Sequence, residues 1–324
     1  MPQRPSNTLP SVRARLGEPA DRLRLVMVRR TLELFAEADD PMANTMDHAG
    51  DPGLFGPESL TWEIMGDASG FIGGIRALLI QAAHPEVVAG VHDHSRYRED
   101  PLGRLSRTSN YVTATSYGAM PEVDQAVRVV RAAHRRVRGV SHRGIEYSAD
   151  RPEFAAWVHN SLTDSFLECA RVYGARPLTE AECDQFVREQ ARIGRLLDAD
   201  PIPETAAELS RWVAEHPAIG PSPGMREAVE FLRDPPLDPA VKVAYQVLAA
   251  AAVATIPPRL QRALGLKPRA GAVRIGRVSA GAMRWALGSS PRWRQALLRT
   301  GAPVPEERFK QKVPFEALQD RVAS

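Results

Sequence analysis

The stretch VDQAVRVVRAAHRRV, residues 123–137, decides how the rest of the sequence is interpreted. Its apolar residues and its one histidine recur at spacings of four, three, four and three residues: Val123, Val127, Val130, His134 and Val137. This spacing predicts one buried stripe of an amphipathic helix, which Gly139 would end as a C-cap. The opposite face carries arginines, so the helix has two distinct sides and its imidazole lies on the buried one.

A buried imidazole has two common roles. A neutral ring that faces an apolar pocket can bind iron through its free nitrogen. More often, a histidine on an apolar face is a core residue whose ring nitrogens bond to the backbone or to another side chain. The helix alone leaves both roles open for His134.

A second stretch, DPLGRLSRTSNYVTATSY at residues 100–117, adds polar groups in a helical pattern. Arg104, Arg107 and Thr108 stand at positions i, i+3 and i+4, which share one face of a helix. Two guanidinium groups and a hydroxyl could bind carboxylates or an oxygen ligand of iron. The alternative is a solvated basic face in an arginine-rich chain.

Several separated segments together resemble one family. These are FIGGIRALLIQAAHPEVVAGVHDHS (71–95), the Arg104, Arg107 and Thr108 triplet, the helix with His134, and EYSADRPEFAAWVHNSL (146–162). They are similar to the MpaB-type and latex-clearing-protein oxygenases over about residues 66–217. The resemblance implies an all-α fold, a haem b cofactor, and oxidative cleavage of carbon–carbon double bonds in isoprenoid chains by dioxygen.

The resemblance also implies roles for single residues. His134 matches the proximal iron ligand, and Arg104 and Thr108 match an arginine and a threonine on the distal side. Arg107 stands where latex-clearing proteins have a lysine that can bind iron. Arginine keeps its proton and has no acceptor, so we expect a resting iron without a nitrogen ligand from residue 107.

Further residues are expected around the cofactor. Gly73 and Gly74 interrupt an apolar helix, which either a flat cofactor or a second helix in close contact would explain. His84 and His94 are expected to line the pocket. The H-x-H pair that His94 completes, on an extended segment, would need a third ligand to bind a metal ion itself.

The catalytic acid is harder to assign. Glu86 and Asp93 are candidates because they lie near the histidines in the sequence.

Composition limits the protein class. The chain has 324 residues, of which 44% are hydrophobic and 25% charged, as in ordinary globular proteins. Its two cysteines have no CxxC spacing, so neither a disulfide framework nor a cysteine zinc site is indicated. HExxH, Glu-x-x-His, GxSxG, Walker and GxGxxG motifs do not occur. The first twenty residues lack an apolar signal region, so we expect a cytoplasmic protein.

We expect three regions: an N-terminal arm, helix and connection (1–57), a haem-binding oxygenase-like domain (58–256), and a basic extension (257–324). Helices are predicted at 21–38, 152–173, 179–197, 204–216, 223–232 and 238–254. Residues 259–299 contain ten arginines or lysines and no acid, which would suit an anionic membrane surface or simply a solvated surface. No nucleic-acid-binding motif accompanies this charge.

The sequence therefore predicts a haem-dependent oxygenase that acts with dioxygen on a small hydrophobic substrate, such as an isoprenoid or another unsaturated chain. The first alternative is a non-catalytic helical carrier of haem or lipid. The second is a helical interaction protein that docks a partner through its basic C-terminal region.

Overall fold

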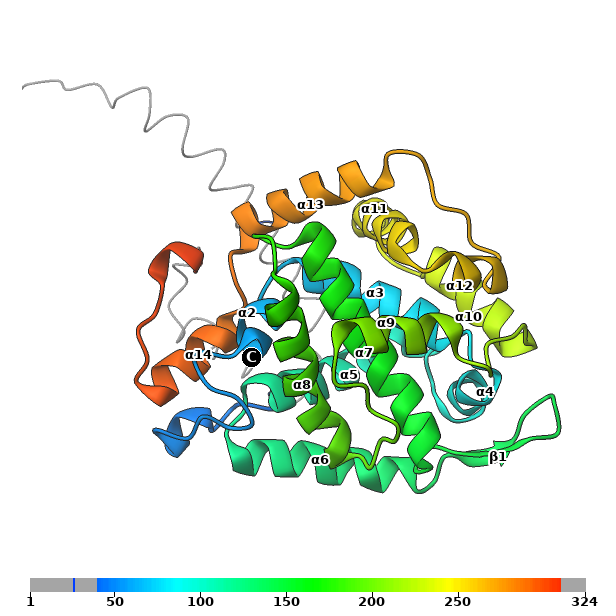
Figure 1. Cartoon of the computed structure of the whole chain (residues 1–324), viewed down its shortest axis with the longest axis horizontal. Helices are drawn as coiled ribbons and strands as arrows, with labels where there is room; N and C mark the ends of the chain where they lie inside the picture. Colours follow the sequence, from blue (N-terminus) through cyan, green and yellow to red (C-terminus); the bar gives the residue numbers. More distant parts are fainter. Residues whose placement is uncertain (1–25, 27–39, 310–324) are drawn as a thin grey trace, which may run out of the picture.

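The computed structural model describes residue 26 and residues 40–309, and this part of the chain is almost entirely helical (Figure 1). It contains thirteen α-helices and one short two-stranded hairpin. The all-α prediction is thus confirmed apart from that hairpin, and the helices form a single domain. The helix predicted at 21–38 lies, except for Val26, outside the described residues.

The elements follow one another in this order: η1 (Thr45–His48), α2 (Leu60–Met65), α3 (Ser69–Gln81), α4 (Pro85–His94), α5 (Pro101–Tyr117), α6 (Met120–His134), β1 (Arg138–Val140), β2 (Glu146–Ser148), α7 (Pro152–Tyr173), α8 (Glu180–Leu196), α9 (Ala206–Glu215), α10 (Pro223–Arg233), α11 (Pro239–Thr255), α12 (Pro258–Ala263), α13 (Ala272–Leu287), α14 (Pro291–Thr300) and η2 (Glu306–Arg308). None of the described helices is long and apolar enough to cross a bilayer.

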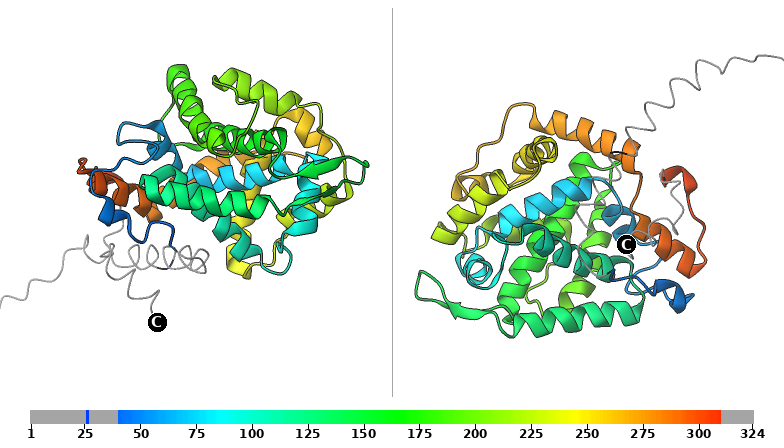
Figure 2. Two further views of the ribbon diagram at one scale, coloured as in Figure 1. Left: turned by 90° about the horizontal axis from the view of Figure 1, so that it is seen from below. Right: turned by 180° about the vertical axis from the view of Figure 1, so that it is seen from behind.

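Helix α7 lies at the centre, and other helices cover it on several sides (Figures 1 and 2). Its side chains are buried along the whole helix, from Trp157 through Leu167 to Tyr173. Helix α3 packs along α7, and α11 packs on α3 and also contacts α13. Helices α8 and α9 pack on α7 as well. The predicted bounds of α7 are confirmed, and Thr179 opens α8 through a capping box with Glu182.

The contact between α3 and α7 explains one of the two predicted cofactor glycines. A Cβ atom on Gly73 would lie 3.0 Å from Cδ1 of Phe166 and 3.3 Å from the carbonyl oxygen of Ser165. At Gly74, no described atom would lie within 4 Å of such a Cβ. Gly73 therefore allows the close approach of α7, which was one of its two predicted explanations.

The helix that carries His134 ends earlier than predicted. It stops at His134, and Gly139 is not its C-cap but the middle residue of β1, where it pairs with Tyr147 of β2. A Cβ on Gly139 would lie 2.6 Å from Oη of Tyr147. The glycine is thus required by the tyrosine that packs across the hairpin, and Val137 lies outside the helix.

The H-x-H pair is also placed differently from the prediction. His92 and His94 lie in the last turn of α4 and not on an extended segment, so the two rings point about 200° apart around the helix. Nδ1 of His92 is 2.9 Å from Oδ1 of Asp93, and Nε2 of His94 is 3.1 Å from the carbonyl oxygen of Arg138. Among the described residues, no group of three or more His, Cys, Asp or Glu side chains is arranged to hold a metal ion.

The described part of the basic C-terminal region packs onto the rest of the domain. Helix α13 packs on α11 and α7, while α14 packs on η1 and α5. The Arg299 side chain is fully buried, and its Nε donates to the carbonyl oxygen of Asp51 at 2.8 Å. Residues 257–309 therefore share one folded body with the helices that precede them.

Candidate functional site

Helices α5 and α6 form an antiparallel hairpin that brings the predicted site residues to one end. Only Gly118 and Ala119 join the two helices, which contact each other. Arg104 lies fourteen residues before Gly118, and His134 lies fifteen residues after Ala119. At 1.5 Å per residue, each is about 21–23 Å along its helix from the turn. Arg104 and His134 therefore each lie at the end of their helix that is far from the turn.

His134 is the last residue of α6, and its ring is half-buried. Burial lowers the pKa of His134 below its usual value, although the nearby Asp150 carboxylate acts in the opposite direction. Burial therefore favours the neutral ring, and no hydrogen bond of this ring occurs within the described residues. A neutral imidazole without a bonding partner has a lone pair available for a metal.

The apolar stripe of α6 supports this orientation. Val123 and Val127 are buried, and Val130 is half-buried like His134. The prediction that the imidazole shares the buried side of α6 is therefore confirmed as far as His134.

Arg104 is the one member of the predicted triplet that turns inward. Its side chain is half-buried, and its Cζ lies 5.9 Å from the centroid of the Tyr97 ring. Its guanidinium makes no hydrogen bond or ion pair within the described residues, and burial lowers its pKa. A cation that has lost water without gaining a carboxylate partner raises the free energy of the fold, so Arg104 is suited to an anionic ligand.

Arg107 and Thr108 share the helix with Arg104 but face solvent. The Arg107 side chain is 61% exposed, and its Nη1 is 3.2 Å from Oδ2 of Asp100. The Thr108 hydroxyl donates to the Arg104 carbonyl oxygen at 3.1 Å, within its own helix. The structure therefore does not gather the triplet around one point, and the distal roles of Arg107 and Thr108 stay predictions.

Tyr111 is a candidate that the sequence patterns had not singled out. It follows Arg104 by seven residues and Thr108 by three, which places it on their side of α5. Its Oη is buried and has no hydrogen-bond partner within the described residues. Burial raises the pKa of Tyr111 above its usual value, so the hydroxyl keeps its proton and can donate. The spacing from Arg104 was the signal that could have identified it.

Unpartnered buried polar atoms are concentrated on this hairpin. The described residues contain eight buried side-chain nitrogen or oxygen atoms without a partner. Four of them lie on α5 or α6, on Ser106, Tyr111, Ser116 and Glu122. Ser116 and Glu122 lie beside the turn, about 18 Å along the helices from Arg104 and His134, so only Ser106 and Tyr111 are candidates to contact a ligand at that end.

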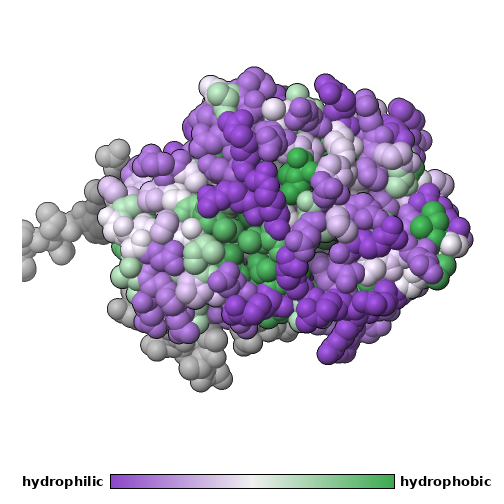
Figure 3. All heavy atoms as spheres, turned by 60° about the horizontal axis from the view of Figure 1, so that its bottom comes forward, coloured by the Kyte–Doolittle hydropathy of each residue, from purple (hydrophilic) through white to green (hydrophobic). Residues whose placement is uncertain are grey.

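These groups fit a haem in their chemistry. A neutral imidazole suits iron, and a guanidinium and a hydroxyl suit the propionate groups of the macrocycle. Figure 3 turns the α6 side of the molecule forward and shows apolar residues gathered among hydrophilic ones on this face. Apolar surface with a few polar groups is typical of cofactor sites.

His84, a predicted pocket residue, lies in a different part of the core. It is 3% exposed, and its ring centroid lies 5.5 Å from that of Phe154 and 5.4 Å from that of His216. Burial, and next the nearby His216, lower the pKa of His84 to about 4. These neighbours belong to α7 and to the segment after α9, so the structure does not bring His84 to the α5–α6 hairpin.

The two candidate acids already have partners. Glu86 accepts hydrogen bonds from Nε of Arg143 at 3.0 Å and from the Ser141 hydroxyl at 2.9 Å. Burial opposes ionisation, but these bonds hold the pKa of Glu86 below its usual value. Asp93 accepts from Oη of Tyr147 at 2.6 Å. Both carboxylates fix the β1–β2 hairpin to α4, which explains them without catalysis.

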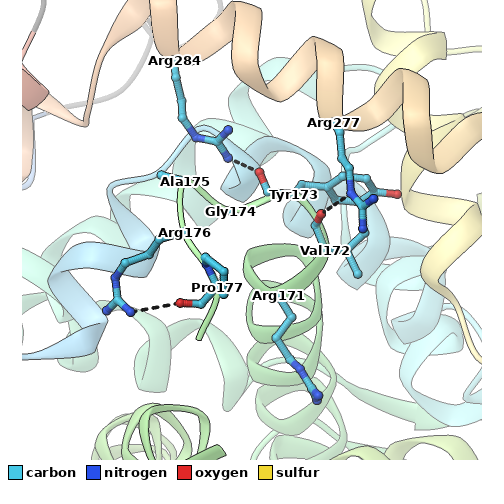
Figure 4. A pocket seen from close by; sticks show the side chains of 9 residues that line it. All are labelled: Arg171, Val172, Tyr173, Gly174, Ala175, Arg176, Pro177, Arg277 and Arg284. Atoms are coloured by element: carbon cyan, nitrogen blue, oxygen red, sulfur yellow. Dashed lines mark hydrogen bonds between the residues drawn. The ribbon is translucent and has the colours of Figure 1, made fainter. Parts of the chain in front are cut away.

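Two clefts lie away from α5 and α6. One, of about 410 Å³, is lined by residues near α9 that include Trp212 and His216. The other, of about 320 Å³, is lined by the end of α7 and by arginines of α13 (Figure 4). There Arg284 and Arg277 donate to carbonyl oxygens of Tyr173 and Val172, and Arg284 also pairs with Asp67. Since its cations have partners, this cleft is not a strong anion site.

The fold and the hairpin define a class: a helical protein with a half-buried histidine and an unpartnered arginine on two consecutive helices. The chain belongs to the family described as ER-bound oxygenase mpaB/B'/Rubber oxygenase, catalytic domain, whose sequence model matches residues 62–285. No curated protein and no solved structure matches the chain. The match covers more than half of the chain and runs from α2 into α13. The resemblance expected from the sequence is thus confirmed, and the chain is an enzyme of an oxygenase family.

Proposed function

We propose that this protein is a haem b-dependent oxygenase that uses dioxygen on a hydrophobic, unsaturated substrate, with His134 as the iron ligand. The observation that carries the proposal is the pair of groups at one end of the α5–α6 hairpin. Burial favours the neutral ring of His134, which makes no hydrogen bond within the described residues, and Arg104 is partly desolvated without an anionic partner there. The family supports it, because rubber oxygenases are haem enzymes.

Each side chain has a distinct part in this proposal. When bound, haem supplies an iron centre that can react with dioxygen. His134 presents a neutral ring nitrogen, and Arg104 binds negative charge through its guanidinium. The Tyr111 hydroxyl donates a hydrogen bond from a buried position, where such a bond is stronger than in water. The apolar surface of the hairpin holds the substrate and excludes water.

A carrier of haem would use the same residues without turnover. The family favours the oxygenase, because the matched region is described as a catalytic domain.

The first experiment compares two histidine variants in purified, haem-loaded protein. His134→Ala should lose most of the Soret absorbance, because the iron loses its protein ligand. His142→Ala is the matched control, because His142 is an exposed histidine between β1 and β2. It should keep the wild-type spectrum. A His134→Ala protein with unchanged haem content and spectrum would overturn the ligand assignment.

The second experiment compares two arginines on one helix. Arg104→Ala should lower oxygen uptake with a polyunsaturated substrate about tenfold or more, as expected when a desolvated charged hydrogen bond is lost. Arg107→Ala should have a much smaller effect, because its side chain faces solvent and pairs with Asp100. Equal losses of oxygen uptake in both variants would show that the exposed arginine contributes to activity as much as the half-buried one. Haem binding without any oxygen uptake in the wild type would favour the carrier.

A further inference from the structure

Helix α13 presents a row of apolar side chains to solvent. It forms one edge of the molecule, at the top of Figure 1. Ile275 is 54% exposed, Val278 68% and Trp285 43%. No other described helix has more than one large apolar side chain among the exposed ones. Surface apolar residues are ordinary when scattered, but three on one helix form a surface of their own.

These side chains form one stripe. Ile275, Val278, Ala282 and Trp285 follow at steps of three, four and three residues, which places them within about 80° around the helix. The outer face of α13 is therefore regular, and the stripe is about 15 Å long at 1.5 Å per residue.

The opposite face holds the stripe in its outward position. It consists of small residues, of which Ala272, Gly276 and Ala280 are buried. A Cβ on Gly276 would lie 2.7 Å from the Ala251 Cβ and 2.7 Å from Cε1 of Tyr173, so α13 packs very close to α11 and α7. The helix cannot rotate its larger residues inward without losing this contact. The packing of α13 on α11 and α7 therefore keeps the stripe exposed to solvent.

Positive charge accompanies the stripe. Arg274 and Arg277 are exposed and lie beside it, on the side of α7. The preceding α12 and the loop after it add exposed Arg259, Arg262, Lys267 and Arg269. No aspartate or glutamate occurs between residues 239 and 305. Asp67 ion-pairs with Arg284 of α13, and Glu168 on the neighbouring α7 is half-buried.

We propose that α13 docks this protein on the surface of an anionic lipid bilayer. The apolar stripe enters the boundary between head groups and acyl chains, and the arginines beside it contact lipid phosphates. Tryptophan prefers this interface because its ring is apolar and its N–H is polar. A second copy of the chain is a poorer partner, because it would bring the same positive charge to the contact. The proposal does not depend on the cofactor.

The experiment measures co-sedimentation of the full-length protein with vesicles. Phosphatidylcholine vesicles are compared with vesicles that also contain phosphatidylglycerol, at low and at high salt. We expect binding only to the anionic vesicles, with a steep loss at high salt. Arg274→Ala should weaken binding about fivefold, the effect of one interfacial cation.

A matched pair of valines tests the stripe itself. Val278→Asp should abolish binding, because it places a negative charge at the centre of the stripe. Val140→Asp is the control: Val140 is 60% exposed on β1, which lies away from α13 in Figure 1, and this variant should bind like the wild type. Haem content and oxygen uptake in detergent should be the same in both variants, which separates this test from the test of the proposed function.

Three results would overturn the docking proposal. The first is absence of binding to anionic vesicles at low salt. The second is equal loss of binding in the two valine variants. The third is a wild-type dimer in size-exclusion chromatography that Val278→Asp converts to a monomer, which would show that a second copy covers the stripe.

Discussion

Two tyrosines on α5 allow the candidate site to be tested by stability as well as by activity. Tyr117 is 3% exposed, and its hydroxyl donates to the carbonyl oxygen of Trp62 at 3.0 Å. Tyr111 packs against the same apolar cluster, but its buried hydroxyl has no partner within the described residues. The change Tyr→Phe removes one oxygen from each position and leaves the ring in place. The two substitutions should therefore change the free energy of unfolding in opposite directions.

The magnitudes follow from the hydrogen bonds. A buried hydroxyl without a partner costs about 1–3 kcal/mol, so Tyr111→Phe should leave the cofactor-free protein as stable as the wild type or about 1 kcal/mol more stable. Tyr117→Phe loses a buried bond and should cost about 1 kcal/mol, since the Trp62 carbonyl still accepts from the Gly66 amide. The predicted difference between the variants is about 2 kcal/mol.

The assay is urea unfolding at neutral pH, first without haem and then with haem bound. In the cofactor-loaded protein, Tyr111→Phe should lose the stability that it gains without haem. Its haem affinity should fall about fivefold if the hydroxyl donates to the cofactor. Tyr117→Phe should leave the affinity unchanged, because its hydroxyl is already used within the protein.

Two outcomes would refute this reasoning. Equal destabilisation of the cofactor-free protein by both changes would mean that the Tyr111 hydroxyl has a partner in the protein itself. Unchanged haem affinity in Tyr111→Phe would remove Tyr111 from the site.

Three further predictions concern packing, pH and residue 107. Gly73→Ala should be about 1–2 kcal/mol less stable than Gly74→Ala in urea unfolding, because only the first Cβ meets α7, and equal stability would contradict the packing argument. Burial holds the pKa of His84 and of His159 at about 4. The unfolded chain binds more protons below its histidine pKa of about 6.5, so the free energy of unfolding should fall by a few kcal/mol from pH 7 to pH 4. His84→Gln should flatten this slope, and an unchanged slope would exclude His84 as a cause. Arg107→Lys should leave the resting ferric spectrum unchanged, since a solvated lysine keeps its proton; a new nitrogen-ligated spectrum would place residue 107 at the iron.

Local signals predicted most of the helices. The Thr179 capping box, the prolines that open α5 and α7, and the apolar periodicity of α6 act within a few residues, so the sequence alone contains them. The end of α6 depends on a distant partner. Gly139 is predicted to end the helix, but in the structure it pairs with Tyr147 across the β1–β2 hairpin.

For the site residues too, local spacing could be predicted from the sequence, but contacts between distant segments could not. The sequence correctly placed Arg104, Arg107 and Thr108 on one helix, because their spacing fixes a shared side. It could not predict which of them turns inward, since that depends on how α5 sits against Tyr97 and α6. It also could not separate the two explanations of Gly73, because only the structure places Phe166 beside that glycine.

A comparison of two arginines strengthens the assignment of the hairpin. Arg76 is buried in the core, and the fold satisfies it: Nη1 donates to Asp164 at 2.7 Å and to Ser165 at 2.9 Å, and Nη2 reaches the Thr255 carbonyl oxygen. The same chain leaves Arg104 without any such acceptor. A protein that can build the first arrangement has no structural reason to keep the second. We propose that the desolvated charge on α5 serves an anionic group that binds there, and that the cofactor-free protein is less stable because this charge has no partner.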